Sequence, residues 1–331
     1  MRLRHRWLGA LFAVAAGVLA APGAPRAADV VKLGDLATLS SAPVYLAIEK
    51  GFLKDEGIDL ATERFTAAAR MNSAFAAGEL DAGVGTANAG LFNAIAQGFD
   101  IKIVADKGQI RPGYGYEKLM VRKDLVESGQ VKSPKDLKGR KIAVLGKGTV
   151  NSYELAKVLE HDGIAFKDVE LVVLGPAQTL QAFAGKSIDG GIIVEPWVTR
   201  AIAERVAVTL ASFEDIPVLR NHQVALIIYT GKFIRERRPV AQRFMNAYVK
   251  GIEFLTKRGW QDDDVLDAIF KHTGVERALV KQAVPAYISP DGRPHVESLV
   301  RLQDWLYEEG MVNRKVSMDQ VVDLSFLPPP R

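Results

Sequence analysis

The feature that most constrains the fold is an internal repeat that fills much of the chain. The segment Phe75–Val84 (FAAGELDAGV) has a counterpart in Phe183–Ile192 (FAGKSIDGGI), which lies 108 residues further on. Further matches occur upstream in the same order and at nearly the same offset, as between Leu46 and Leu155. We therefore expect one β-α-β-α-β unit to occur twice in the chain, with small insertions and deletions between the two copies.

Two copies of one α/β unit predict two similar lobes whose equivalent loops face each other. The loop Leu36–Pro43, after the first strand of the first copy, corresponds to Leu145–Ser152 in the second. Ligands of open α/β sheets bind outside the carboxyl ends of the strands. The repeat therefore predicts a ligand held in a cleft between two lobes.

The second of these loops lies in a strand–turn–helix segment. Lys141–Leu145 is a short apolar run typical of a buried strand, and Gly146–Thr149 is a glycine turn. A helix then begins near Asn151, and backbone N–H groups at such a helix start can bind an anion. An ordinary β–α turn has the same composition, so this segment alone does not decide between the two interpretations. It matches neither the Walker A loop nor the dinucleotide-binding glycine motif.

Composition excludes several classes of function. The chain has 331 residues, which is enough for about two domains, and it contains no cysteine. Disulfides, thiol nucleophiles and thiolate metal sites are therefore excluded. The net charge is only +4 and no basic run is present, so we expect no nucleic-acid partner. We expect the protein to be a monomer.

Residues 1–28 are predicted to be a secretory signal peptide. Arg2, Arg4 and Arg6 form a positive start, and the apolar run Leu8–Ala21 is too short to span a bilayer comfortably. No later stretch is long and apolar enough to be a membrane helix. We therefore expect an exported, soluble, periplasmic protein.

Two irregular segments divide the chain. Gly108–Tyr116 is rich in Gly, Pro and Tyr, and we interpret it as a linker between the lobes; Phe213–Gln223 is predicted to be a second crossing. A strand at Val224–Tyr229 then returns to the first lobe, which a helical C-terminal region completes. We therefore assign residues 29–110 and 220–331 to a discontinuous lobe 1, and residues 111–219 to lobe 2.

Candidate binding residues lie in loops at the carboxyl ends of strands or on the crossing, where polar or aromatic side chains could face the cleft. They are Thr38, Ser40, Ser41, Phe65, Thr86, Asn88, Gln109, Tyr116, Thr149, Asn151, Glu195 and Trp197. For each residue, helix capping or hinge packing is the alternative role. Asp81 and Asp189, at the start of equivalent strands, are interpreted as structural.

No catalytic or metal constellation can be recognised. The histidines lack the spacing of zinc ligands, no G-x-S-x-G elbow is present, and no carboxylate pair stands out as a general acid and base. We therefore predict no catalytic residues, no metal ligands and no cofactor.

The same segments resemble a known family. Ala42–Ala47, Lys50–Leu53, Ala77–Asp81, Asp136–Val144 and the Ile188-Asp189 pair leading to Glu195-Pro196 are similar, in order and spacing, to periplasmic substrate-binding proteins of ABC importers. The resemblance is to the nitrate, aliphatic sulfonate and taurine receptors, including the thiamine-precursor branch, and it covers nearly the whole chain after residue 28.

This resemblance implies an α/β, type II periplasmic-binding-protein fold with two lobes joined by a two-crossing hinge. It also implies docking to the membrane permease of an ABC importer and a small polar organic ligand such as a sulfonate or a taurine-like molecule. Two alternatives stay open: an enzyme on the same fold, such as a menaquinone-pathway lyase, and a receptor for a pyrimidine or thiamine precursor.

The polarity of the ligand is a further hypothesis. Thr149, Asn151 and nearby N–H groups are expected to hold an acidic or strongly accepting part of the ligand. Glu195, placed after the equivalent third strand, is expected to hold a donor on the other side, since a carboxylate would repel a plain anion.

Overall fold

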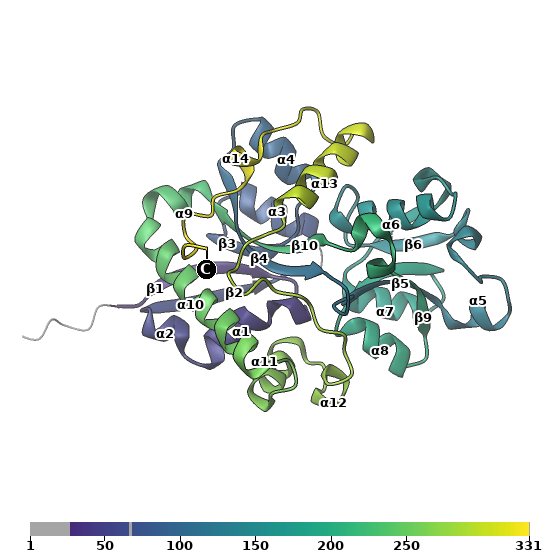
Figure 1. The fold of residues 1–331 in the computed structure, drawn as a ribbon, viewed down its shortest axis with the longest axis horizontal. Coiled ribbons are helices and arrows are strands. Elements are labelled where there is room, and N and C mark those ends of the chain that lie inside the picture. Colours follow the sequence, from purple (N-terminus) through teal and green to yellow (C-terminus); the bar gives the residue numbers. More distant parts are fainter. Residues whose placement is uncertain (1–26, 66–67, 331) are drawn as a thin grey trace, which may run out of the picture.

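The computed structural model describes residues 27–65 and 68–330 and contains two five-stranded sheets (Figure 1). The predicted signal peptide therefore falls almost entirely outside the described residues. The first sheet has the order β2 (Ile58–Arg64), β1 (Asp29–Asp35), β3 (Ala82–Gly85), β10 (His222–Thr230), β4 (Ile101–Ile110). The second has the order β7 (Glu170–Val173), β6 (Lys141–Val144), β8 (Gly190–Val194), β5 (Glu117–Arg122), β9 (Ala207–Ser212). We call the first sheet with its helices lobe 1, and the second lobe 2.

The two sheets have equivalent topology, as the repeat predicts. In each, three parallel strands are followed by an antiparallel strand that came from a crossing between lobes. The registers also agree: Leu33 pairs with Ala82 in lobe 1, and Ile142 pairs with Gly190 in lobe 2. The duplicated sequence has therefore produced duplicated strand pairing.

Asp81 and Asp189 have the same role in the two lobes. The carboxylate of Asp81 accepts a hydrogen bond from the Lys32 backbone N–H at 3.0 Å, and Asp189 accepts one from the Lys141 N–H at 3.0 Å. Each aspartate thus ties the start of the third strand to the start of the first. Their structural interpretation is confirmed.

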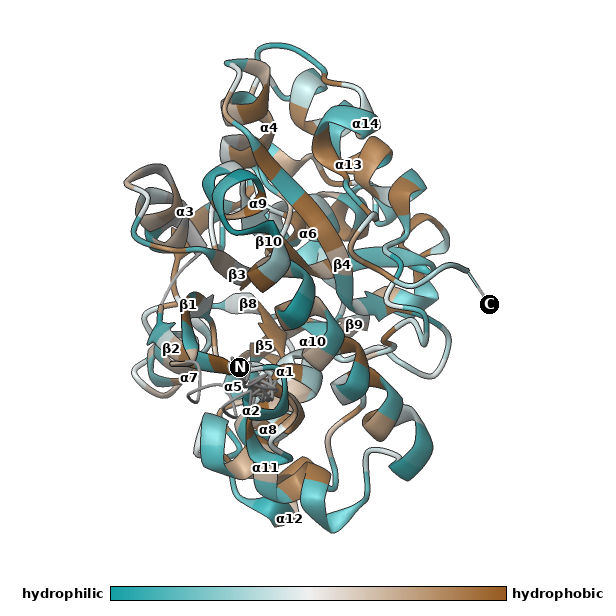
Figure 2. Cartoon of the chain, turned by 90° about the vertical axis from the view of Figure 1, so that its left-hand side faces the viewer, coloured by the Kyte–Doolittle hydropathy of each residue, from teal (hydrophilic) through white to brown (hydrophobic). Residues whose placement is uncertain are grey.

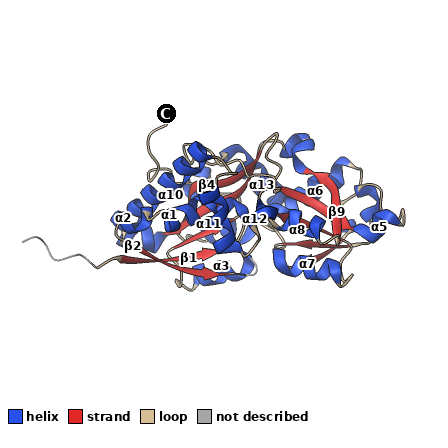
Figure 3. Ribbon diagram, turned by 90° about the horizontal axis from the view of Figure 1, so that it is seen from below, coloured by secondary structure: helices blue, strands red, loops and turns tan. Residues whose placement is uncertain are grey.

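Helices cover both faces of each sheet (Figure 3). Lobe 1 contains α1 (Ala42–Glu49), α2 (Phe52–Asp55), α3 (Ala68–Ala76), α4 (Ala89–Ala96), α9 (Gly231–Glu236), α10 (Arg238–Arg258), α11 (Asp263–Thr273), α12 (Arg277–Val280), α13 (Val296–Glu308) and α14 (Met318–Val321). Lobe 2 contains α5 (Lys123–Glu127), α6 (Val150–His161), α7 (Pro176–Ala184) and α8 (Trp197–Ala203). Figure 2 shows helices with both hydrophilic and hydrophobic stretches, as expected of elements with one face on a core.

Two expectations about the crossing segments need correction. Strand β4 continues to Ile110, so Gly108–Ile110 is paired strand and not linker, and β10 already begins at His222. Glycine and glutamine form strands poorly on their own, but here tertiary pairing with β10 overrides propensity. A Cβ on Gly108 would lie 2.8 Å from the Tyr116 hydroxyl, so a close approach also requires glycine there.

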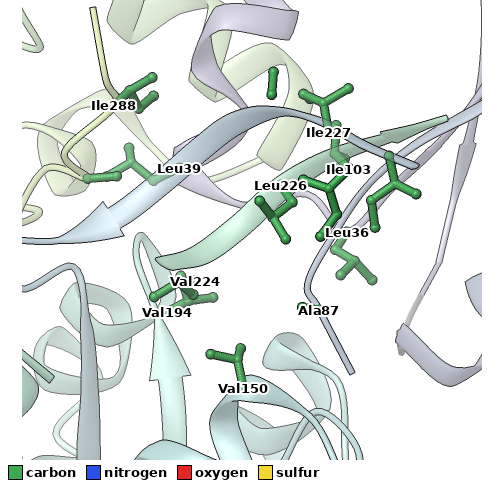
Figure 4. Packing of buried hydrophobic residues seen from close by; sticks show 14 of the residues in the cluster. Leu36, Leu39, Ala87, Ile103, Val150, Val194, Val224, Leu226, Ile227 and Ile288 are labelled. Atoms are coloured by element: carbon green, nitrogen blue, oxygen red, sulfur yellow. The ribbon is translucent and has the colours of Figure 1, made fainter. Parts of the chain in front are cut away.

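The core continues from lobe 1 into lobe 2. Helix α13 packs against α6, with the Trp305 ring 5.6 Å from Tyr153 and 5.4 Å from Phe166, both edge-on. Figure 4 shows Val150 and Val194 of lobe 2 close to Val224 of lobe 1. In the part of the chain that the structure describes, no helix has the length and hydrophobicity needed to cross a membrane.

Candidate functional site

A small cavity lies between the two lobes, at the carboxyl ends of β1, β3 and β8. Its volume is about 20 Å³, which is room for about one water molecule. Polar and charged residues from both lobes line it together with apolar ones: Leu36, Thr38, Ser40, Val84, Gly85, Thr86, Lys107, Tyr116, Glu117, Leu145, Asn151, Val194, Val224 and Ala225. A larger ligand therefore requires the lobes to move apart.

Lys107 is the cationic group in the lobe 1 wall. It is almost fully buried, and its Nζ donates hydrogen bonds to Thr38 Oγ1 at 3.1 Å and Ser40 Oγ at 3.0 Å. Burial lowers the pKa of Lys107 to about 8, while nearby carboxylates oppose that shift. The ammonium is thus still mostly charged at neutral pH and can pair with an acceptor in the cleft.

A fully paired carboxylate stands behind this wall. Asp35, at the end of β1, accepts hydrogen bonds from Ser41 Oγ at 3.0 Å and Tyr45 Oη at 2.9 Å. Both donors come from the loop and helix that follow β1. Asp35 thereby fixes the loop that carries Thr38 and Ser40 toward the cavity.

The lobe 2 wall is acidic. Glu117 begins β5, and Asn151 and Glu154 lie one turn apart near the start of α6. The Asn151 amide donates to Glu117 Oε1 and, at 3.2 Å, to Glu154 Oε2. Burial raises the pKa of Glu117 to about 8, and burial together with the Glu117 charge raises the pKa of Glu154 well above its usual range.

The lobes contact each other through equivalent loops on either side of the cavity. Leu39 N–H in lobe 1 donates to the Glu195 carbonyl at 3.0 Å, and Ala89 N–H donates to the Gly148 carbonyl of lobe 2 at 2.8 Å. Leu39 and Gly148 occupy corresponding loops of the two copies. The repeat therefore provides matched contacts across the cleft.

Of the residues predicted from the sequence, five line the cavity: Thr38, Ser40, Thr86, Tyr116 and Asn151. Four other predicted residues form local structure beside the cavity. The Ser41 hydroxyl donates to Asp35, and the Asn88 side chain caps α4 by accepting from the Leu91 N–H. The Gln109 side chain accepts from Arg111 and donates to the Arg293 carbonyl, and the Thr149 hydroxyl donates to the Gly146 carbonyl.

Glu195 has partners that were not expected. Its carboxylate accepts from the N–H and hydroxyl of Thr199, at 3.0 and 2.9 Å, and from the Val284 N–H at 3.1 Å. Val284 belongs to lobe 1, so Glu195 both caps α8 and joins the lobes. The structure thus commits the Glu195 acceptors to the protein itself, as it commits the Asn151 amide donors.

Phe65 and Trp197 lie in an outer pocket of about 190 Å³ that adjoins the cavity at Leu36. Arg64 and the start of α7 also line this pocket. The buried Trp197 Nε1 has no hydrogen-bond partner among the described residues. The cleft thus has an inner cavity lined by polar and apolar residues of both lobes, and an outer pocket that contains two aromatic side chains.

Sequence reasoning missed Lys107, Glu117 and Glu154. Each is a charged residue in a strand or helix that also carries apolar core residues, and each is buried. That signal was available, because charged side chains at positions whose neighbours form a core are rarely buried without a role. Their proximity to one another could not be predicted, since it depends on how the two lobes are packed.

A larger hollow of about 900 Å³ lies elsewhere on lobe 1, lined in part by α4 and α9. Its charged side chains pair with one another, as Arg237 does with Asp81 at 3.0 Å and Arg235 with Asp100. Its lining residues all belong to lobe 1, so it does not bring groups from the two lobes together. Within residues 27–65 and 68–330, no group of three or more potential metal ligands is present.

Comparison with known families gives a match to the NMT1/THI5-like model over residues 38–259. A candidate aliphatic sulfonates-binding protein of Bacillus subtilis is 25% identical over 323 residues, which is 94% of this chain and 91% of that protein. A similarly named Escherichia coli protein is 24% identical over 207 residues, and the match spans 60% of its length and 59% of this chain. The yeast enzyme 4-amino-5-hydroxymethyl-2-methylpyrimidine phosphate synthase THI5 is 26% identical over 225 residues, 64% of this chain and 62% of the enzyme.

Solved structures establish the fold. The ligand-binding component of an ABC-type import system from Staphylococcus aureus superposes with a TM-score of 0.72 at 16% identity, covering 90% of this chain and 97% of that one. The alkanesulfonate-binding protein SsuA from Xanthomonas axonopodis gives 0.69 at 21% identity, covering 88% and 97%. The two-lobed periplasmic-binding-protein fold implied by the sequence is therefore confirmed.

Proposed function

The chain belongs to the NMT1/THI5-like family, and on that premise we propose that it is a solute-binding receptor of an ABC importer. It captures a small polar organic ligand, such as a sulfonate or a taurine-like molecule, between its lobes and delivers it to a membrane permease. The observation that carries this proposal is the cavity between the lobes, where buried polar groups from both copies of the repeat converge.

The proposal includes location and domain organisation. Residues 1–28 direct export to the periplasm and are then removed. Residues 29–110 with 220–331 and residues 111–219 move as two bodies, and the crossings near 111–116 and 213–221 absorb the change. The protein acts as a monomer. The names of the structural neighbours, which include components of import systems, support this assignment.

A disulfide that locks the cleft tests the proposal directly. Asn88 of lobe 1 and Thr149 of lobe 2 form an isolated antiparallel bridge, so their Cα atoms lie about 4.5–5.5 Å apart, within disulfide range. Because the chain has no cysteine, the Asn88→Cys, Thr149→Cys double variant carries only this pair of thiols. The same protein, reduced, is its own control for the loss of the two native side chains.

The variant is unfolded and refolded to remove bound compounds, and is then prepared in an oxidised and a reduced form. Each form is incubated with the small-molecule fraction of the culture medium. Native mass spectrometry should find a small molecule bound, chemically unchanged, to the reduced form only. Equal uptake by the oxidised form would mean that the ligand does not enter through the cleft. Absence of any bound compound would contradict a receptor.

The second candidate function is catalysis on the same fold. It is favoured by the similarity to the yeast pyrimidine phosphate synthase and by the raised pKa of Glu117, which suits a general acid or base near neutral pH. The same experiment separates the two, since an enzyme returns a compound of altered mass and a receptor returns the original.

A further inference from the structure

The acidic cluster formed by Glu117, Asn151 and Glu154 has an unusual hydrogen-bond balance. Asn151 has two amide hydrogens, and it directs one to Glu117 Oε1 and one to Glu154 Oε2. All three side chains are almost completely buried. The cluster therefore uses all of its own amide donors internally.

Three acceptor atoms remain. Glu117 Oε2, Asn151 Oδ1 and Glu154 Oε1 are buried and have no hydrogen-bond partner among the described residues. Unpaired buried acceptors are costly, and the cluster offsets part of that cost by sharing a carboxyl proton between Glu117 and Glu154, which a donor of the ligand can replace. Glu117 and Asn151 line the cavity, and Glu154, three residues after Asn151 on α6, is joined to them through the Asn151 amide.

Cationic groups of the described residues donate no hydrogen bond to this cluster, although the charge of Lys107 opposes part of the rise in the pKa of Glu117. The Lys107 ammonium is already hydrogen-bonded to Thr38 and Ser40 on the opposite wall. His222 Nε2 lies 3.8 Å from Glu154 Oε1, but burial lowers the pKa of His222 to about 3, so it is neutral. The lobe 1 wall therefore presents donors and a positive charge, whereas the lobe 2 wall presents carboxyl groups that burial keeps protonated near neutral pH and whose proton a cationic ligand group can replace.

We propose that the Glu117–Asn151–Glu154 cluster is the specificity subsite of the cleft and binds a cationic, N–H-rich end of the ligand, such as an ammonium or an aminopyrimidine. The proposal rests on the receptor function proposed above. Lys107, with the Thr38 and Ser40 hydroxyls, takes the accepting end of the same molecule. A sulfonate without a nitrogen donor would satisfy only one wall.

Matched probe pairs test this. Taurine and isethionate differ only in an ammonium against a hydroxyl, and 4-amino-5-hydroxymethyl-2-methylpyrimidine is paired with its 4-hydroxy counterpart. In calorimetric titration of the chain without residues 1–28, at least one amino compound should bind, and about 10–100-fold more tightly than its partner. This is the factor that loss of one hydrogen bond to a charged group produces.

Variants connect the preference to the cluster. Glu117→Gln replaces one acceptor oxygen by a donor and should remove the preference for the amino compound. Glu117→Asp keeps a carboxyl group and should retain part of the preference. Glu160→Gln is the matched control, because it removes a carboxylate from an exposed position of the same helix, where Glu160 pairs with Lys157, and should leave the preference unchanged.

The inference is overturned if a hydroxyl compound binds as well as its amino partner, if Glu117→Gln keeps the full preference, or if none of the four probes binds. Its failure is distinguishable from failure of the receptor function. Tight binding of isethionate alone would overturn the acidic subsite while supporting a receptor. Uptake by the oxidised cysteine variant would contradict the receptor function itself.

Discussion

The two walls of the cleft descend from the same repeated unit but meet their hydrogen-bonding needs differently. At an offset of 109 residues, Asp35 corresponds to Val144 and Tyr45 corresponds to Glu154. Lobe 1 places a carboxylate on the strand and surrounds it with hydroxyl donors. Lobe 2 has an apolar strand end and places the carboxylate on the helix, beside a second one from β5. The Asp35 carboxylate of lobe 1 has hydrogen-bond partners within its own lobe. The carboxyl groups of lobe 2 keep acceptor atoms that have no partner among the described residues.

This difference teaches that the repeat preserved the scaffold and not the site. Strand order, register and the Asp81 and Asp189 ties are common to both lobes. The cleft residues are not: Ala225 of β10 lines the cavity where Glu117 of β5 does so from the other lobe. The two copies therefore line the cavity with different side chains on a common scaffold.

The largest loss of stability should come from removing the Asp35 carboxylate behind the lobe 1 wall. Asp35→Ala leaves the Ser41 and Tyr45 hydroxyls buried without their acceptor and removes a negative charge near Lys107. We expect a loss of about 2–4 kcal/mol in the free energy of unfolding, measured by urea denaturation. Asp35→Asn is the control, because it keeps one carbonyl acceptor, and it should lose clearly less. An Asp35→Ala protein as stable as the wild type would mean that this wall is not held by its carboxylate.

A smaller effect should be equal in the two lobes. Asp81→Ala and Asp189→Ala each remove the carboxylate that accepts a hydrogen bond from the backbone N–H at the start of a strand. Each also removes an ion pair, with Arg237 in lobe 1 and with Arg122 and Arg140 in lobe 2. Each should cost about 1–2 kcal/mol in urea denaturation, with the two values alike. A large inequality would show that the common scaffold is not used in the same way by both copies.

The scaffold that the two lobes share could be predicted from the sequence, whereas only part of the cavity lining could. The repeat and the apolar strands were enough to predict two equivalent α/β lobes, because strand and helix patterns are local and occur twice in the chain. Thr38, Ser40, Thr86 and Asn151 were predicted because they follow strands at their carboxyl ends, and Tyr116 because it lies on the crossing; the structure places all five at the cavity.

Other features depend on packing between segments far apart in the chain. Lys107 and Glu117 come from strands of different lobes, and nothing local indicates that they face one cavity. Glu195 was expected to face a ligand, but Val284, from a C-terminal loop, supplies its donor instead. Helices α1 and α2 are separate elements because Gly51 adopts a φ of 76° between them.

The smallest predicted effect is a gain of stability when Glu154, in the acidic cluster of lobe 2, is replaced by glutamine. Glu154→Gln keeps the size of the side chain but removes an ionisable group next to Glu117, and it supplies a donor to the cluster. At pH 8 we expect the variant to be more stable than the wild type by about 1 kcal/mol in urea denaturation. The equivalent change in lobe 1, Asp35→Asn, should have the opposite sign, which makes the comparison between the walls sharper.

The gain from Glu154→Gln should also depend on pH. Because the folded pKa of Glu154 is raised, the folded wild type binds a proton that the unfolded chain releases above pH 4.5. The wild type is thus stabilised by that proton at low pH and loses the stabilisation as the pH rises, whereas the glutamine variant does not titrate here. The difference in unfolding free energy should be near zero at pH 4.5 and grow toward pH 8. Asp106, Lys107 and His222, whose pKa values are also shifted by burial, are present in both proteins and contribute equally to first order. A gain that is constant from pH 4.5 to 8 would mean that Glu154 keeps an ordinary pKa, and that the lobe 2 wall carries no proton for a cationic ligand group to replace.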